Sequence, residues 1–294
     1  DIEAMEGAVI RVDDVTARVR MEDTMIQTEK MLSVGGLAAG MAHEINNPLS
    51  GILQSAQNIL RRLDPALAKN NAVAEAQGTP LAAIRRYLEG RGIIRFIEGI
   101  RQSGERASTT VSDMLHFSRP SDARRRPTAL DALLDKTVGL AAHDYDLRKK
   151  YDFRDIEIQR DFENDLPPVP CVATEIEQVI LNLLRNASQA LEATQPAGPK
   201  PVIVLRLRRE TAFVRIEVED NGPGMDEETR KRVFEPFFTT KDVGVGTGLG
   251  LSVSYFIVTS HHQGTMTVDS TAGQGARFTL RLPLGTDPVA AASG

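Results

Sequence analysis

The chain has 294 residues, with 35 Lys and Arg against 40 Asp and Glu, one Cys and no Trp. This length is enough for two domains with cores of their own, since one domain usually takes about 100–200 residues. The net charge of −5 argues against a general nucleic-acid binder, and the single Cys171 excludes an internal disulfide framework and a Cys-rich zinc site.

Helical patterns dominate the first half of the chain. A short strand fits residues 7–16, and helix-compatible residues then run with few breaks to about residue 63. Pro, Asn and Gly residues interrupt the pattern at 64–80. A short helix fits 81–88, and a second long helix fits 93–118. The first thirty residues lack the apolar core of a signal peptide, and the chain starts at Asp1 without an initiator Met, as a piece of a longer protein would.

Helices and strands alternate in the second half. Helices fit 129–150, 174–193 and 250–260, and strands fit 155–161, 202–208, 212–219, 265–269 and 276–281. The proline-rich stretch 167–170 is interpreted as a linker, as is the basic run 124–126, and the pair His261-His262 as exposed histidines at a helix end. This mixture predicts an α/β or α+β layer after a helical first half.

The first helix carries a histidine opposite its apolar stripe. At 100° per residue, Ile45, Ile52 and Ile59 lie on one continuous apolar face suited to a bundle, whereas His43 falls on the opposite side. Most lone exposed histidines on helices have no chemical role. Here Pro48 removes an amide donor and bends the helix nearby, and a carboxylate follows His43 directly. An exposed imidazole beside an acid is a reasonable phosphoacceptor.

The run His43-Glu44-Ile45-Asn46-Asn47-Pro48-Leu49 resembles the H-box of sensor histidine kinases of two-component systems. The resemblance implies that His43 accepts the γ-phosphoryl group of ATP on a ring nitrogen. It also implies that Glu44 orients the imidazole and takes its proton. The pattern Glu44-x-x-Asn47 resembles the family's phosphatase motif, in which Asn47 would position the water that removes phosphate from the partner protein.

Two segments of the second half suggest a nucleotide site. Asn182 and Asn186 share a helix face, and two amides at this spacing can hold a hydrated Mg²⁺, although a polar helix surface explains a lone Asn pair as well. Asp220 ends a strand and precedes Gly222 and Gly224, which let the backbone approach a flat ring. These segments resemble the N-box and the adenine site of the same family, which implies Asn186 as the Mg²⁺ ligand, Asn182 as its support and Asp220 as the acceptor for the adenine amino group.

Two further segments resemble the family's ATP lid. Residues 232–241 resemble the F-box, with Lys241 available to phosphates. Residues 244–251 resemble the second glycine box, which is rich in backbone amides for anions and includes Gly246, Gly248, Gly250 and Leu251. The glycine spacing does not match a dinucleotide fingerprint, and no Gly-Lys-Ser of a Walker motif follows.

Taken together, the resemblance covers residues 31–282 and implies a helical hairpin, dimerising into a four-helix bundle, followed by an α/β-sandwich ATP-binding domain of the histidine kinase/gyrase type. The expected division is the end of a PAS-like sensor domain and a signalling helix at 1–30, the dimerisation and phosphotransfer domain at 31–122, the catalytic domain at 125–285 and a disordered tail at 286–294. Residues 63–93 make the hairpin longer than is usual for the family.

The implied function is ATP- and Mg²⁺-dependent autophosphorylation on His43, transfer to an aspartate of a response regulator receiver domain, and phosphatase activity toward that regulator. We expect a homodimer in the cytoplasm, with no nucleic acid and no membrane contact by this part, although the full-length protein could be membrane-tethered. Two alternatives stay open: a gyrase-type ATPase, which would carry Glu at the position of Asn182, and a non-catalytic dimeric scaffold.

Overall fold

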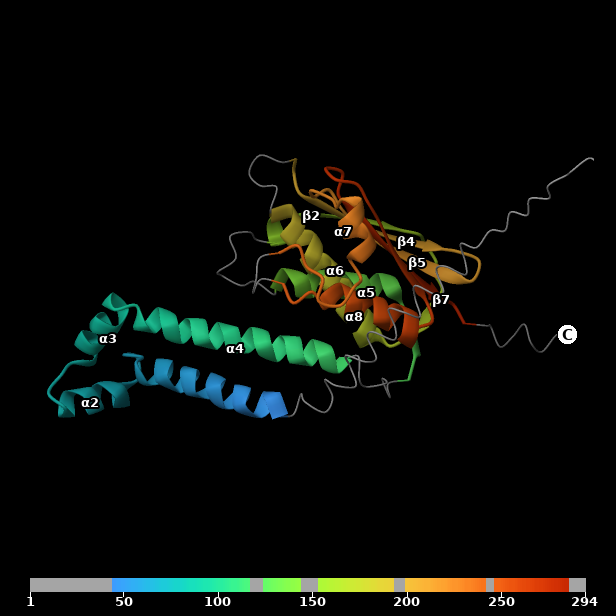
Figure 1. The fold of residues 1–294 in the computed structure, drawn as a ribbon. Helices are drawn as coiled ribbons and strands as arrows, with labels where there is room; N and C mark the ends of the chain where they lie inside the picture. Colours follow the sequence, from blue (N-terminus) through green and yellow to red (C-terminus); the bar gives the residue numbers. More distant parts are fainter. Residues whose placement is uncertain (1–43, 117–123, 144–152, 193–198, 242–245, 286–294) are drawn as a thin grey trace, which may run out of the picture.

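The computed structural model describes residues 44–116, 124–143, 153–192, 199–241 and 246–285 (Figure 1). The predicted phosphoacceptor His43, the strand expected at 7–16 and the tail at 286–294 lie outside the described residues. Within these ranges, no helix is both long enough and apolar enough to cross a membrane.

Two long helices form a hairpin in the first half of the chain (Figure 1). A helix over residues 44–62 packs along α4 (Ile93–His116). Their contact buries Ala56 on the first helix and Ile97 and Val111 on α4. Gly104 brings the helices close, because a Cβ there would lie 2.8 Å from Cδ2 of Leu53. The predicted pair of long helices is therefore confirmed.

Two short helices, α2 (Ala68–Ala76) and α3 (Leu81–Gly90), close the tip of the hairpin. Asn70 donates from Nδ2 to the carbonyl oxygens of Arg61 and Asp64, both at 2.8 Å, and so caps the end of the first helix. Arg85 adds a longer bond of 3.4 Å to the carbonyl oxygen of Leu63. The helix expected at 81–88 is confirmed, but the break expected at 64–80 is wrong in part. Since α2 buries only Ala74, its sequence carries no apolar stripe that could have indicated a helix.

A five-stranded sheet forms the base of the second half. Its order is β2-β4-β5-β7-β6, with β2 parallel to β4 and every other neighbour antiparallel. The strands are β2 (Glu157–Phe162), β4 (Val202–Arg209), β5 (Phe213–Asp220), β6 (Thr265–Ser270) and β7 (Ala276–Pro283). A separate antiparallel pair joins β1 (Arg126–Thr128) to β3 (Val169–Cys171).

Helices cover one face of this sheet (Figure 1). They are α5 (Leu130–His143), α6 (Ala173–Glu192), α7 (Glu227–Arg232) and α8 (Gly250–Phe256), with a 3₁₀ turn η1 at Phe153–Asp155 and a π-helical turn η2 at Ile257–His261. The core lies between α6 and the sheet, where Ile180 and Leu184 are buried together with Leu205 and Ile216. Alternating strand residues on the other face form ion pairs such as Arg277 with Glu219 at 2.9 Å.

Three expectations for this half are corrected. The linker interpretation is wrong in part, because residues 169–170 of the proline-rich stretch lie in β3 and Arg126 of the basic run lies in β1, and these two strands pair. The helix expected at 250–260 changes to a π-turn after Phe256. His262 is 1% exposed rather than a surface residue, because its ring lies between two backbone groups. Its Nε2 accepts from the amide of Val172 at 3.0 Å, and its Nδ1 lies 3.0 Å from the carbonyl oxygen of Ile257.

Candidate functional site

Asp220 lies at the end of β5 with only 7% of its surface exposed. Its Oδ1 accepts a hydrogen bond from the backbone amide of Gly222 at 2.9 Å. Burial raises the pKa of Asp220 to about 6, although backbone bonds from Gly222 and Ala276 act in the opposite direction. A buried carboxylate of this kind is suited to accept a hydrogen bond from a ligand that replaces the lost water.

The glycines after Asp220 keep the surroundings of the carboxylate open. A Cβ on Gly222 would lie 2.8 Å from Oδ1 of Asp220 and 3.4 Å from Cβ of Ala190, near the end of α6. Gly224 has a φ of +65°, and a side chain there would collide with the carbonyl oxygen of Thr271. The close approach of these backbones therefore depends on glycine, as expected for a slot that takes a flat ring.

One face of α6 carries three amides in succession. Asn182, Asn186 and Gln189 lie within two helical turns and are all half-buried. Asn182 donates from Nδ2 to Oγ of Ser254 at 3.0 Å, and its side chain fills the space that a Cβ on Gly250 would need. Gln189, which no sequence motif indicated, continues the amide face by one further turn.

Lys241 reaches this amide face from the chain that follows α7. Its Nζ donates to Oδ1 of Asn186 at 3.4 Å and also to Oε1 of Gln189. Its backbone amide donates to Oγ1 of Thr239 at 3.2 Å. The structure thus brings Asn186 and Lys241, which lie in separate motifs, into direct contact.

The glycine-rich segment lies against the same elements. A Cβ on Gly246 would lie 2.9 Å from Oγ1 of Thr239, and one on Gly248, whose φ is +68°, would collide with the backbone of Phe237. Gly250 begins α8 beside Asn182, and half-buried Leu251 packs against the core. These positions therefore line one end of the α6 face, and Asp220 with Gly222 lies at the other end.

The amide oxygens of Asn186 and Gln189 fit a hydrated cation, because both already converge on one positively charged group. Across the residues that the structure covers, no cluster of three or more His, Cys, Asp or Glu could hold a metal. A Mg²⁺ ion on these amides would take further oxygens from water and from nucleotide phosphates, which is its usual coordination.

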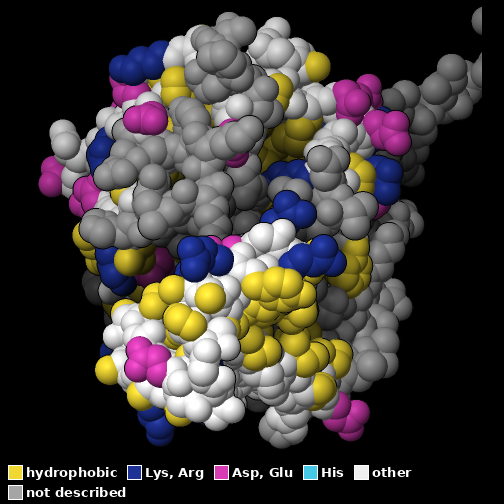
Figure 2. All heavy atoms as spheres, turned by 90° about the vertical axis from the view of Figure 1, so that its left-hand side faces the viewer, with side chains coloured by type: hydrophobic (Ala, Val, Ile, Leu, Met, Phe, Trp, Pro, Cys, Tyr) yellow, Lys and Arg dark blue, Asp and Glu magenta, His cyan; other side chains and the backbone are white. Residues whose placement is uncertain are grey.

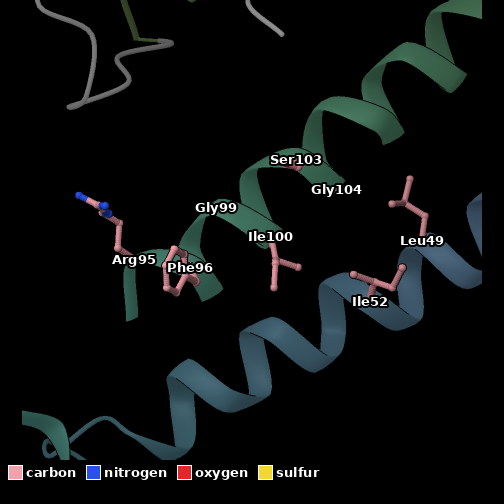
Figure 3. A pocket seen from close by; sticks show the side chains of 8 residues that line it. All are labelled: Leu49, Ile52, Arg95, Phe96, Gly99, Ile100, Ser103 and Gly104. Atoms are coloured by element: carbon pink, nitrogen blue, oxygen red, sulfur yellow. The ribbon is translucent and has the colours of Figure 1, made fainter. Parts of the chain in front are cut away.

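The hairpin carries the other predicted residues, Glu44 and Asn47, which are both exposed on the first helix. The structure does not bring them together with the α6 face. A groove of about 730 Å³ between the first helix and α4 is lined mainly by apolar side chains and includes neither Glu44 nor Asn47. In Figure 3, Leu49 and Ile52 of the first helix and Ile100 of α4 point into the space between the two helices, whereas Arg95 points away.

Comparisons with known proteins agree with this arrangement. Residues 171–286 match the family of histidine kinase-, DNA gyrase B- and HSP90-like ATPases. The sensor kinase CckA of Brucella abortus is 35% identical over 95% of this chain, which covers 27% of CckA. The chain spans half or less of the length of CckA and of two other curated relatives, the sensor kinases AtoS and ZraS of Escherichia coli.

Two solved structures share the fold. Full-length ShkA in complex with AMPPNP has a TM-score of 0.59 and 25% identity, over 86% of this chain and 46% of that one. The histidine kinase ThkA in complex with the response regulator protein TrrA has a TM-score of 0.52 and 24% identity, over 93% of this chain and 68% of that one. Both structures therefore match the fold of the helical hairpin and of the α/β part. Together with the ATPase match at residues 171–286 and the 35% identity to CckA, this shows that the chain belongs to the sensor histidine kinase family, with a helical hairpin followed by an ATPase domain of the histidine kinase, gyrase and HSP90 type.

Proposed function

We propose that this chain binds Mg²⁺-ATP between α6 and the glycine-rich segment and transfers the γ-phosphoryl group to His43. The observation that carries the proposal is the continuous site along α6. An acceptor for the adenine amino group, Asp220, lies near one end, and three neutral amides with Lys241 follow toward the other. Such a site positions phosphates and stabilises their charge, which is most of what phosphoryl transfer requires.

Each residue has a distinct part in this proposal. Asp220 accepts from the adenine amino group, and Gly222 and Gly224 let the ring approach. Asn186 ligates Mg²⁺, which supplies charge neutralisation at the phosphates when bound. Asn182 supports this site from its bond to Ser254, and Lys241 contacts phosphate oxygens. Backbone amides of Gly246, Gly248, Gly250 and Leu251 lie along the phosphates.

The residue at position 182 distinguishes phosphoryl transfer to protein from hydrolysis of ATP, because a gyrase-type ATPase would carry Glu where this chain carries Asn182. Asn182 is held by Ser254 at 3.0 Å, and an amide is a poor general base for activating water. The gyrase-type alternative is therefore disfavoured, and ATP is kept for His43. Glu44 would orient the imidazole of His43 and take its proton, from an exposed position on the same helix.

The partner in the next step is a receiver domain of a response regulator, to which His43 passes the phosphoryl group on an aspartate. The complex of ThkA with TrrA, which has the same fold, supports a partner of this class. Asn47 is exposed one turn after His43 and would position water for the reverse, phosphatase reaction. Because ATP is the donor, we place this part of the protein in the cytoplasm.

We also propose the division into a sensor-end segment at 1–30, a dimerisation and phosphotransfer domain at 31–122, a catalytic domain at 125–285 and a tail at 286–294. Homodimerisation through the hairpin is supported by its exposed apolar side chains, including Ile45, Ile52 and Ile59, which recur every seven residues. In Figure 2, hydrophobic side chains gather over the hairpin in the lower half of the view.

Incubation of the purified chain with radiolabelled ATP and Mg²⁺ tests the central step. We expect label that is stable to base and labile to acid, as a phosphohistidine is, and that disappears in His43→Gln. Label on Ser or Thr would overturn the proposed acceptor. Release of phosphate without any protein label would favour the gyrase-type alternative, and no nucleotide binding at all would favour the scaffold.

The phosphatase step has a separate test. A regulator receiver domain is phosphorylated chemically with acetyl phosphate, purified and incubated with the kinase and ADP. We expect Asn47→Ala to slow dephosphorylation while leaving the labelling of His43 in place. Equal rates with and without the substitution would remove Asn47 from this role.

A further inference from the structure

The ammonium of Lys241 lies where two neutral amide oxygens of α6 converge. Nζ donates to Oδ1 of Asn186 at 3.4 Å and to Oε1 of Gln189, three residues further along the same helix face. All three side chains are half-buried. Neither amide carries a charge, so the attraction is that of a cation for oxygen lone pairs, the same attraction that a divalent cation would use.

The stem of Lys241 is held on this side of the site by its own chain. Its backbone amide donates to Oγ1 of Thr239 at 3.2 Å, which closes a tight turn. Gly246 approaches so closely that a Cβ there would lie 3.3 Å from Cδ of Lys241. The ammonium is therefore directed toward α6 by local structure.

We propose that Lys241 occupies the cation position of the nucleotide-free protein and that Gln189 is a second oxygen of this position beside Asn186. A divalent cation and an ammonium cannot share the same two oxygens, because they repel and compete for the same lone pairs. Binding of the metal then displaces Lys241, and the displaced ammonium becomes available to phosphate oxygens. Lys241 thus acts as a positioning residue that couples metal entry to the phosphate contact. The proposal rests on the proposed Mg²⁺-ATP function.

Binding of Mn²⁺, measured by electron paramagnetic resonance of the free ion, tests the competition without any phosphorylation. In nucleotide-free protein, Lys241→Met removes the competing charge and nearly keeps the length of the side chain. We expect it to bind Mn²⁺ at least about fivefold more tightly than the original chain. Lys231→Met is the matched control, since Lys231 lies on α7 with 66% of its side chain exposed and pairs only with a surface glutamate in the described contacts. It should leave Mn²⁺ affinity unchanged.

The role of Gln189 is tested in the same assay. In the Lys241→Met background, Gln189→Ala should remove most of the gain in Mn²⁺ affinity, because one of the two oxygens is lost. A gain that survives this substitution would exclude Gln189 from the cation position. Thermal melting of each variant checks that the fold is kept, and Lys241→Gln serves as a second neutral variant if Lys241→Met melts early.

Failure of the competition and failure of the nucleotide site give different Mn²⁺ binding results. Equal Mn²⁺ affinity, or undetectable Mn²⁺ binding, in the nucleotide-free original chain and Lys241→Met would overturn the competition, even if both proteins bind Mn²⁺ together with ADP. If neither protein binds Mn²⁺ in the presence of ADP, the proposed Mg²⁺-nucleotide site itself is wrong and this inference falls with it.

Discussion

The buried carboxylate of Asp220 makes nucleotide binding sensitive to pH. Its pKa is raised to about 6 by burial, so the group takes up a proton as the pH falls through this value. A protonated acid is a poorer acceptor for an adenine amino group. We therefore expect ADP affinity, measured by calorimetry in Mg²⁺ buffer, to weaken between pH 7.5 and 5.5. Since the phosphates of ADP also titrate in this range, the comparison needs a variant without the carboxyl group.

Asp220→Asn provides that variant. Loss of a hydrogen bond to a charged acceptor costs roughly 1.5–3 kcal/mol, so ADP affinity at pH 7.5 should fall about 10- to 100-fold. The remaining affinity should depend on pH only through the phosphates, with a slope smaller than that of the original chain. Equal slopes in the two proteins would show that Asp220 does not titrate in the binding range.

His262 ties η2 to the start of α6 through its ring, and it should matter for folding rather than for chemistry. Replacement by Phe leaves the amide of Val172 without its described partner, at roughly 1–3 kcal/mol for an unsatisfied group, whereas the carbonyl oxygen of Ile257 keeps its bond of 3.1 Å from the backbone amide of residue 262. We expect urea unfolding of the ATPase domain at pH 7.5 to occur at a lower urea concentration. His261→Gln is the control, with a smaller loss expected because 16% of its side chain is exposed.

The same histidine predicts how stability varies with pH. Burial lowers the pKa of His262 below its ordinary value of 6.5, so the unfolded chain binds a proton at a pH where the folded chain does not. The contribution of neutral His262 is therefore fully present above pH 6.5 and is lost as the pH falls below it. Urea midpoints at pH 7.5 and 5.5 should differ more for the original chain than for His262→Phe. An equal difference would assign the pH dependence to other groups.

At the scale of elements, the hairpin depends on a close contact at Gly104. A Cβ there would lie 2.8 Å from Cδ2 and 3.0 Å from Cγ of Leu53, so Gly104→Ala overpacks the helix pair. Overpacking costs about 1–3 kcal/mol, and the better helix propensity of Ala returns about 1 kcal/mol. We expect a net loss of up to roughly 2 kcal/mol, measured by thermal melting followed by circular dichroism.

Gly139 is the matched control for this substitution. It lies inside α5 and is exposed, and a Cβ there would meet nothing within 4 Å. Gly139→Ala should therefore raise the melting temperature through helix propensity alone. If both substitutions stabilise the protein, Leu53 moves aside easily and the helix contact at Gly104 is loose.

The elements that sequence patterns predicted are those with a strong period. The helix α6 has a continuous apolar face, and β4 and β5 have alternating apolar residues. All three elements begin and end within one or two residues of the expected bounds. The elements that were missed are short or have no such period: α2 buries only Ala74, α7 has six residues, and β1 and β3 have three residues each. Long-range pairing creates β1 and β3, and a local pattern carries no information about it.

The candidate site was predicted unevenly for a similar reason. Asn182, Asn186 and Asp220 lie in motifs that can be identified from sequence, and they lie on the helix α6 and at the end of the strand β5, the kinds of element expected for them. Gln189 was missed because one polar residue on a helix is unremarkable until Lys241, 52 residues later, donates to it. His262 was assigned to the surface because its polar partners, the backbone of Val172 and Ile257, have no signature in the sequence.

At the scale of the whole molecule, the hairpin has more apolar surface than its two helices can cover. Ile45, Ile52 and Ile59 are 40–50% exposed, and Phe96 and Ile100 on α4 are more than half exposed. Two grooves, of about 730 and 460 Å³, run between these side chains. Burial of such a surface is favourable by about 25 cal/mol for each Å², and a second hairpin carrying the same seven-residue repeat would complete a four-helix bundle.

Ile52 is the residue that tests this dimer, because it lines both grooves and is 50% exposed. In a dimer, Ile52→Glu would bury a carboxylate against apolar side chains without a cation, and each bundle would contain two of them. We expect light scattering after size exclusion to give twice the chain mass for the original protein and a single chain mass for the variant. Val73→Glu is the control, since Val73 is 57% exposed on α2 and lines neither groove, and it should remain dimeric. A dimeric Ile52→Glu protein would place the contact elsewhere, and the apolar face of the hairpin would then need another partner.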